Sequence, residues 1–305
     1  MMNLALIVGL ISGAILSGTS LLYATIGEIF GERSGIVNLG LEGIMLTGAA
    51  TGFAATAVTG NPYYGIAAAA LAGAAINLIF AYLVVGRRAN QLAAGLTLMF
   101  FGFGLSALVG RPFVGTLIAG LPRLKLFDLA PGGALARLFS YDVLVYLAVP
   151  AAVLIWWLLF RTRWGLALRT TGENPAVAFA AGLRPERLRY QALILAGLFG
   201  GVAGAHISVA LTRTWAEGMT AGRGFIAIAL VIFAKWNPLW AIAGALLFGG
   251  AEGLQLQLQA AGADVSPFIM NMLPYLLTLL VLILWGWRRQ SAAPAALGRS
   301  FVGVE

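Results

Sequence analysis

Long apolar stretches recur along most of this 305-residue chain. A bilayer core needs a helix of about 20 apolar residues. Hydrophobic residues make up 60% of the chain and charged residues only 10%, against about 25% charged in soluble domains. We therefore expect an all-α polytopic membrane protein, with residues 1–305 forming a single transmembrane domain of about nine helices (eight to ten). The predicted spans are 4–26, 36–58, 63–85, 92–110, 141–160, 191–212, 224–234, 239–259 and 268–287.

One of these spans is too short for a complete crossing. The stretch 224–234 has half the usual length, which predicts a half-helix buried in protein or a helix that begins earlier. Pro150 and Pro274 lie inside spans and are expected to kink them. We expect the first stretch to be a span and not a signal peptide, because it is long and lacks a basic flank and a cleavage site.

Small residues recur at four-residue spacing inside the spans. Gly48 and Gly52 form one such pair, and Gly197 and Gly201 form another. Such faces allow two helices to approach closely. We expect these pairs to mark helix–helix packing within the chain.

Several kinds of chemistry are excluded or made improbable by what the sequence lacks. There is no Cys and only one His, His206, so disulfides and thiolate sites are excluded and a His-built metal site is disfavoured. Neither a phosphate-binding loop nor a common hydrolase motif occurs, so the chain is not expected to be an enzyme or to hydrolyse ATP itself. His206 either contacts substrate or relays protons, or, more commonly for such a residue, joins two helices by a hydrogen bond.

The positive charges predict the orientation. The net charge of +8 indicates basic cytoplasmic loops, and not a nucleic-acid partner. With nine spans, the basic positions at 87–88, 161–189, 235 and 288–289 all fall on one side. That side is then cytoplasmic, which places the N-terminus outside and the C-terminus inside a bacterial inner membrane. The long segment 111–140 becomes an extracytoplasmic loop.

The segment 27–43 interrupts the apolar pattern with five glycines and several charges. If it is helical, Ser34, Asn38 and Glu42 share one face, because they are spaced four residues apart. A carboxylate within the bilayer normally faces a bundle interior or water. Two readings remain open: the segment is part of a discontinuous helix that lines a substrate pathway, or it is a cytoplasmic turn with Glu42 paired structurally. The charges at 28–33 are expected at the membrane interface.

A second polar set lies late in the chain. Glu252, Gln255 and Gln259 share a helical face, and Asn271 follows in the next predicted span. That face is predicted to line the same pathway as Glu42. Interhelical hydrogen bonding is the alternative.

The segment 161–190 is predicted to be a cytoplasmic loop with a short helix of its own. Asn174 suits an N-cap, Pro175 the first helical position and Gly182 the end. A helix this short is marginal alone, so it either packs on its own bundle or docks into a groove on another protein. The predicted docking residues are Glu173, Asn174, Pro175, Val177, Phe179 and Gly182.

Three of these segments also resemble a known family. The run GEIFGERSGIVNLGLEG at 27–43 resembles the second-span signature of bacterial ABC-importer permeases of the branched-chain amino acid, ribose and nucleoside type, nearest to the nucleoside and simple-sugar permeases. The run GENPAVAFAAG at 172–182 resembles their cytoplasmic coupling helix, and 224–238 resembles a third block. The likeness extends over about 20–290.

The resemblance implies a permease subunit that imports a small polar solute: a nucleoside, or otherwise a nucleobase or simple sugar. Its implied partners are two ATPase subunits that hold ATP and Mg, a second related permease chain, an extracytoplasmic substrate-binding protein and membrane lipids. The transport site would lie between the two permease chains. A self-sufficient secondary transporter or channel, with Glu42 and Glu252 as ion sites, is the alternative. A membrane scaffold is a third reading, which the polar intramembrane faces disfavour.

Overall fold

The computed structural model describes residues 4–125 and 138–260, several residues between 272 and 283, and residues 293–299. Within these residues almost all regular structure is helical, so the prediction of an all-α polytopic membrane protein is confirmed. The α-helices have these bounds: α1 Leu4–Arg33, α2 Leu41–Thr59, α3 Pro62–Ala81, α4 Gln91–Gly110, α5 Val143–Arg161, α6 Arg163–Glu173, α7 Pro175–Ala180, α8 Pro185–Ala205, α9 Arg223–Phe233 and α10 Pro238–Ala260. Short π-helical or 3-10 segments extend three of them: η1 Tyr82–Gly86, η2 Arg111–Phe113 and η4 His206–Leu211.

Six helical segments among the described residues are long and apolar enough to cross a membrane, and they match the first six predicted spans. The 23-residue α10 extends about 35 Å, which also exceeds a bilayer core of about 30 Å. The last predicted span, 268–287, lies mostly outside the described residues, so the total of about nine remains a prediction.

The short predicted span is a short helix in the structure. α9 has 11 residues, or about 16 Å of length. It packs against α1, α2 and α10, and its Ile226, Ala227 and Leu230 are buried. The predicted short helix is confirmed, but only one of its faces is buried, because Phe225 and Ile232 are 40% and 42% exposed.

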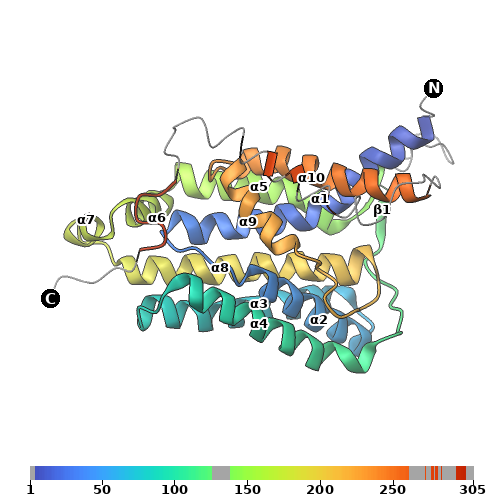
Figure 1. Ribbon diagram of the computed structural model, residues 1–305, viewed down its shortest axis with the longest axis horizontal. Helices are drawn as coiled ribbons and strands as arrows, with labels where there is room; N and C mark the ends of the chain where they lie inside the picture. The colour runs from blue at the N-terminus through green and yellow to red at the C-terminus, as the bar shows by residue number, and fades with distance from the viewer. Residues whose placement is uncertain are drawn as a thin grey trace.

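The helices lie side by side along the long axis of the molecule (Figure 1). α1 packs against α8 and α10, and α2 against α3, α4 and α8. Glycines permit the closest of these contacts: a Cβ added to Gly48 would collide with the backbone of Gly201, and one added to Gly13 would press on Gly253. The predicted role of the small-residue faces in helix packing is confirmed.

Two three-residue strands are the only β-structure among the described residues, and the sequence did not indicate them. β1 (Arg123–Lys125) pairs antiparallel with β2 (Ser140–Asp142). They flank residues 126–137, which lie outside the described part, and Tyr146 Oη donates to the Phe139 carbonyl oxygen at 2.6 Å beside them. β1 lies at the opposite end of the molecule from α7 (Figure 1). The extracytoplasmic position of 111–140 remains a prediction.

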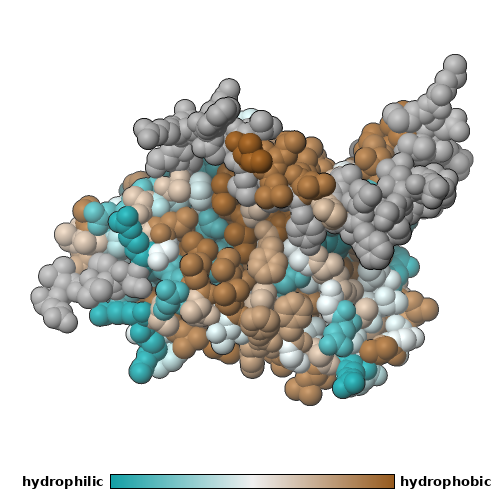
Figure 2. All heavy atoms as spheres, in the orientation of Figure 1, coloured by the Kyte–Doolittle hydropathy of each residue, from teal (hydrophilic) through white to brown (hydrophobic). Residues whose placement is uncertain are grey.

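Most of the predicted basic loops gather at the α7 end. Arg33 donates to the backbone of Lys235, and Gly86, which precedes Arg87, lies beside the Tyr190 hydroxyl near the start of α8. The first turns of α1 lie at the other end (Figure 1). Hydrophilic residues concentrate toward the two ends of the visible face, and apolar residues cover its middle (Figure 2). This arrangement suits a bundle with an apolar belt.

Candidate functional site

The short helix α7 forms as its sequence predicts. The Asn174 Oδ1 accepts hydrogen bonds from the backbone N–H groups of Ala176 at 3.1 Å and Val177 at 3.2 Å. Pro175 occupies the first helical position, where its missing N–H is not needed. Gly182 follows the helix with a φ of +81°, a conformation that favours glycine.

α7 presents apolar side chains to its surroundings. Val177 is 55% exposed and Phe179 51% exposed, whereas Ala178 is buried. The helix lies at one extremity of the molecule (Figure 1) and packs only on α6 and α8 among the described elements for which contacts are given. A rigid, capped helix with an exposed Phe and Val is suited to contact another protein.

Backbone hydrogen bonds join α6 to the connection between α1 and α2, through the segment 293–299. The Ala296 N–H donates to the Gly172 carbonyl oxygen at 2.9 Å, near the end of α6. Two residues later, the Gly298 N–H donates to the Gly35 carbonyl oxygen at 3.2 Å. The helix that carries α7 is therefore tied to residues beyond the end of α1.

Side chains reinforce the same junction. Glu173 Oε2 accepts from the Ala295 N–H at 3.2 Å, so this predicted docking residue also holds the segment 293–299. Arg189 of α8 donates through Nε to the Ser34 carbonyl oxygen at 3.2 Å. Ser34 Oγ itself donates to the Gly31 carbonyl oxygen at 2.6 Å. In this conformation Ser34 is a buried turn residue.

The predicted common helical face of Ser34, Asn38 and Glu42 is wrong. α1 ends before Ser34 and α2 begins only at residue 41, so the first two residues lie in a non-helical connection. Gly35 has a φ of +92°, which ends the helix. Asn38 Oδ1 accepts from the Gly40 N–H at 2.8 Å, a local bond that competes with helix formation.

Asn38 lies at the centre of a buried polar network. Its Nδ2 donates to Asn77 Oδ1 of α3 at 2.9 Å, and Asn77 Nδ2 donates in turn to the Leu193 carbonyl oxygen of α8. The Asn38 N–H donates to Glu28 Oε1 at 3.2 Å. Glu28 is 1% exposed, so its carboxyl group faces protein and not solvent, and its expected position at the membrane interface remains a prediction. These bonds join α1, α3 and α8 around the connection.

Glu42 binds the N-terminus of α9. Its Oε1 accepts from the Thr220 hydroxyl at 2.6 Å and the Gly222 N–H at 2.7 Å, and its Oε2 accepts from the Gly224 N–H at 2.6 Å. The first N–H groups of a helix lack partners within it and favour a negative charge. The buried carboxylate of Glu42, on α2, accepts hydrogen bonds from these N–H groups and supplies the negative charge. In this conformation Glu42 is therefore paired structurally, as the second of its two interpretations predicted.

The other end of α9 is held by the last turn of α1. Trp236 Nε1 donates to Glu32 Oε2, and Arg33 Nε donates to the Trp236 carbonyl oxygen at 3.0 Å. Lys235 and Trp236 have φ values of +52° and +55°, so this turn is tightly constrained. Glu32 is 2% exposed and also faces protein, so its interfacial position likewise remains a prediction. Sequence reasoning missed this partner because it lies about 200 positions away.

The late polar set begins with an ion pair. Arg223, the first residue of α9, binds Glu252 of α10 through Nε at 3.1 Å and Nη2 at 2.9 Å. Their side chains are 16% and 15% exposed, and Gln255 is also half-buried. Asn271 lies outside the described residues. The interhelical bonding considered as an alternative for Glu252 is present, and the predicted pathway role of these residues remains a prediction.

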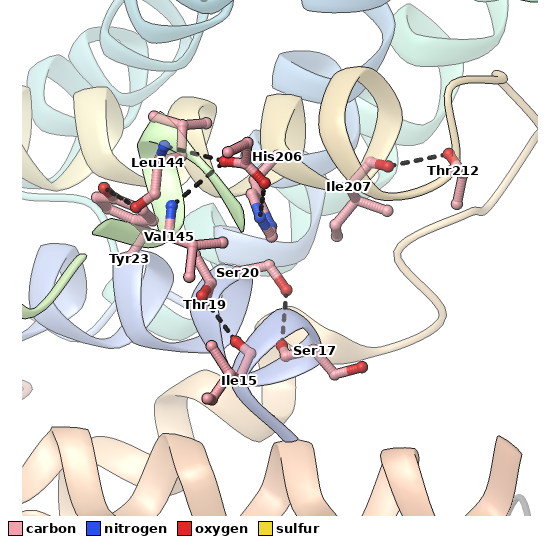
Figure 3. Close-up of polar contacts among 11 residues, drawn as sticks. Ile15, Ser17, Thr19, Ser20, Tyr23, Leu144, Val145, His206, Ile207 and Thr212 are labelled. Atoms are coloured by element: carbon pink, nitrogen blue, oxygen red, sulfur yellow. Dashed lines mark hydrogen bonds and ion pairs between the residues drawn. The ribbon is translucent and has the colours of Figure 1, made fainter. Parts of the chain in front are cut away.

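His206 is buried at the start of η4, near Asp142 at the start of α5. Its Nε2 lies 3.8 Å from Asp142 Oδ2, too far for a hydrogen bond, and neither ring nitrogen has a partner among the described residues. Asp142 Oδ1 caps α5 by accepting from Leu144 and Val145 N–H groups at 2.9 and 3.3 Å. Figure 3 shows this cluster, with Tyr23 Oη donating to the Leu144 carbonyl oxygen at 2.8 Å. The expected helix–helix hydrogen bond of His206 is absent here.

Metal chemistry finds no support in these clusters. Within the described ranges, no group of three or more His, Asp or Glu side chains could hold a metal ion. The buried acids instead accept hydrogen bonds from helix termini and indole or guanidinium groups. The arrangement can hold α9 relative to α1 and α2 and can present α7 to a partner.

Comparison with known proteins is consistent with this arrangement. Residues 10–284 match the family "Branched-chain amino acid transport system / permease component". The chain is 37% identical to TsgC13, a protein of Haloferax volcanii that is named as a glucose ABC transporter permease. The match covers 96% of this chain and 97% of the relative. The chain is 32% identical to the guanosine ABC transporter permease protein NupQ of Bacillus subtilis, over 92% of each chain, and 32% identical to the nucleoside ABC transporter permease protein NupC of Lactococcus lactis, over 96% of each. The chain therefore belongs to the branched-chain amino acid transport system permease family and is a multi-pass permease subunit of an ABC importer, a transport component and not an enzyme.

Proposed function

We propose that this permease takes up a nucleoside. The supporting observation is its similarity over more than nine-tenths of its length to two permeases named for guanosine and for nucleosides. A simple sugar is the second candidate, because TsgC13 is named for glucose. Both solutes are neutral and carry many hydroxyl groups, which Asn, Gln and Glu side chains can bind without an opposite charge.

The proposed assembly contains two ATPase subunits, which hold ATP and Mg²⁺, and a second related permease chain. The ATPases contact α7, so the α7 end is cytoplasmic. A substrate-binding protein delivers the solute at the opposite end, and the pathway lies between the two permease chains. The N-terminus is then outside and the C-terminus inside the inner membrane. Clustering of basic segments at the α7 end supports this orientation.

We propose that movement of α7 reaches α9 through α6. The support is a continuous set of contacts: α6 is bonded to the segment 293–299, and that segment is bonded to Gly35. The residues on both sides of Gly35 then hold the two ends of α9 through Glu32 and Glu42. A rigid displacement of the coupling end would thereby shift a half-helix inside the membrane.

The residues predicted to line the pathway have two different proposed roles. Glu252 and Gln255 are half-buried on α10 and are the stronger candidates for contact with substrate. Asn38 and Glu42 are buried in this conformation and position the helices beside the pathway. The secondary-transporter alternative has less support, because its two proposed ion sites are occupied by hydrogen bonds and an ion pair.

The substrate can be tested with the complete transporter in proteoliposomes, with its binding protein and ATP. Uptake of radiolabelled guanosine is expected, and an excess of unlabelled nucleoside should compete while glucose should not. Competition by glucose alone would replace the nucleoside with the sugar. Uptake by the purified chain alone, driven by an ion gradient, would overturn the ATP-dependent mechanism itself.

The coupling role of α7 can be tested with Phe179→Glu. A charge at this exposed apolar position should weaken ATPase docking and abolish most ATP-driven uptake, while the chain stays folded because Phe179 is 51% exposed. Val58→Glu is a matched control, since Val58 is 76% exposed at the end of α2. Normal ATPase association and uptake in Phe179→Glu would contradict the coupling role.

A further inference from the structure

A groove of about 360 Å³ opens where α5, α6 and α8 meet, apart from the polar network described above. Its lining comes from all three helices and is mainly apolar: Leu158, Trp164, Gln191, Ile194 and Leu195. The indole ring of Trp164 packs edge-on against buried Phe30, with ring centroids 6.0 Å apart. One wall of the groove is therefore fixed to the core of the bundle.

The polar groups of this groove are mostly satisfied within it. Trp164 Nε1 donates to Gln191 Oε1 at 2.8 Å, which uses both the indole donor and the amide oxygen. Only the Gln191 amide N–H groups remain as donors in the lining. A nucleoside or sugar would leave most of its hydroxyl groups unpaired here, at a substantial cost. The groove suits a molecule with a hydrocarbon chain and a hydrogen-bond acceptor at one end of that chain.

Exposed basic residues adjoin the lining of the groove in the sequence. Arg161 lies three positions after Leu158 of the lining, Arg163 immediately precedes Trp164, and Arg187 lies one turn before Gln191. All three arginines are exposed, and one acid, Glu186, is adjacent to them in the sequence. Spacings of three and four residues place Arg161 on the helical face of Leu158 and Arg187 on that of Gln191, while Arg163 is the first residue of α6, next to Trp164. These adjoining residues therefore have a net positive charge.

We infer that this groove binds one anionic phospholipid. The acyl chain lies against the apolar wall of Leu158, Ile194 and Leu195, and the phosphate lies beside Arg163 and Arg187. An indole at the junction of apolar and basic surfaces is typical of the membrane–water interface. Basic clusters at such a junction attract anionic headgroups, whereas a zwitterionic headgroup gains little from them.

The inference can be tested on the purified full-length chain by native mass spectrometry, with dioleoylphosphatidylglycerol and dioleoylphosphatidylcholine titrated separately. The wild type should bind phosphatidylglycerol more tightly. Each basic residue near an anionic lipid contributes about fivefold in affinity, so R163Q/R187Q should weaken phosphatidylglycerol binding about 25-fold and leave phosphatidylcholine binding unchanged. The matched control R87Q/R88Q removes two other exposed arginines near the same end and should have no effect.

A second variant tests the groove independently of charge. Ile194→Trp fills the apolar part and should also displace phosphatidylglycerol, and inorganic phosphate should not compete because it lacks an acyl chain. Equal wild-type affinity for the two lipids, or unchanged phosphatidylglycerol affinity in R163Q/R187Q, would overturn the inference. Loss of association with a second permease chain, without loss of lipid, would identify the groove as a protein interface and overturn it too.

Discussion

Replacing Glu42 with alanine tests whether α9 is held by α2. The carboxylate accepts three hydrogen bonds, from the Thr220 hydroxyl and from the N–H groups of Gly222 and Gly224, all between 2.6 and 2.7 Å. Glu42→Ala leaves two N–H groups without an acceptor, that of Gly224 buried and that of Gly222 half-buried. The Thr220 hydroxyl can rotate toward another acceptor, so the main cost arises from the backbone.

The magnitude follows from those two donors. A buried donor left unpaired costs about 1–3 kcal/mol, so Glu42→Ala should lower the free energy of unfolding by about 2–6 kcal/mol. For a chain of this size, that corresponds to a fall of roughly 4–12 °C in the melting temperature. A thermal-shift measurement in detergent detects such a change, and the variant should also impair uptake because α9 loses its position.

Two matched variants separate this explanation from a general effect of removing an acid. Glu217 is exposed in the same loop, so Glu217→Ala should leave the melting temperature unchanged. Thr220→Val removes one donor but leaves the carboxylate bound to the two N–H groups, so its effect should be smaller than that of Glu42→Ala. If Glu42→Ala melts with the wild type, α9 does not depend on this carboxylate and the reasoning fails.

Two further predictions concern helix contacts. Gly48→Leu should destabilise the chain by about 1–3 kcal/mol, because a Cβ at Gly48 already collides with the α8 backbone. Gly104→Ala is the control and should be neutral, because a Cβ at Gly104 meets open space; the melting temperatures of both variants check this. A double-mutant cycle of Arg223→Ala and Glu252→Ala should give a coupling energy of about 1 kcal/mol, since the pair is bidentate but partly exposed; a coupling of zero would show that the ion pair is not formed.

The sequence predicted best the features that depend on local chemistry. The cap of α7 by Asn174, the position of Pro175 and the conformation of Gly182 each require only a few consecutive residues. Long apolar runs likewise predicted the first six spans, with ends that differ from the observed ones by up to seven residues. The spacing of small residues predicted that Gly48 lies at a helix–helix contact, and the structure shows that α8 is the partner. In each case the deciding interaction lies within one helix or on one helical face.

The polar network could not be predicted in the same way, because its partners are distant in sequence. Periodicity placed Asn38 and Glu42 on one helix, whereas the φ of Gly35 and the bond from Gly40 to Asn38 end the helical path between α1 and α2. Glu32 was expected at the membrane interface because charged residues near the ends of membrane-spanning helices commonly lie there. Its indole partner, Trp236, comes from a turn that only tertiary folding brings there.

The position of α9 follows from these distant contacts and determines how the bundle can move. Glu32 precedes the α1–α2 connection and Glu42 follows it, yet each binds an opposite end of the same 11-residue helix. Separating α9 from the connection would leave buried polar groups unpaired at both ends, whereas moving them together breaks none of these bonds. Gly35 in that connection is bonded to the segment 293–299, which also holds α6. In the proposed coupling, α6, the segment 293–299, the connection and α9 therefore move together.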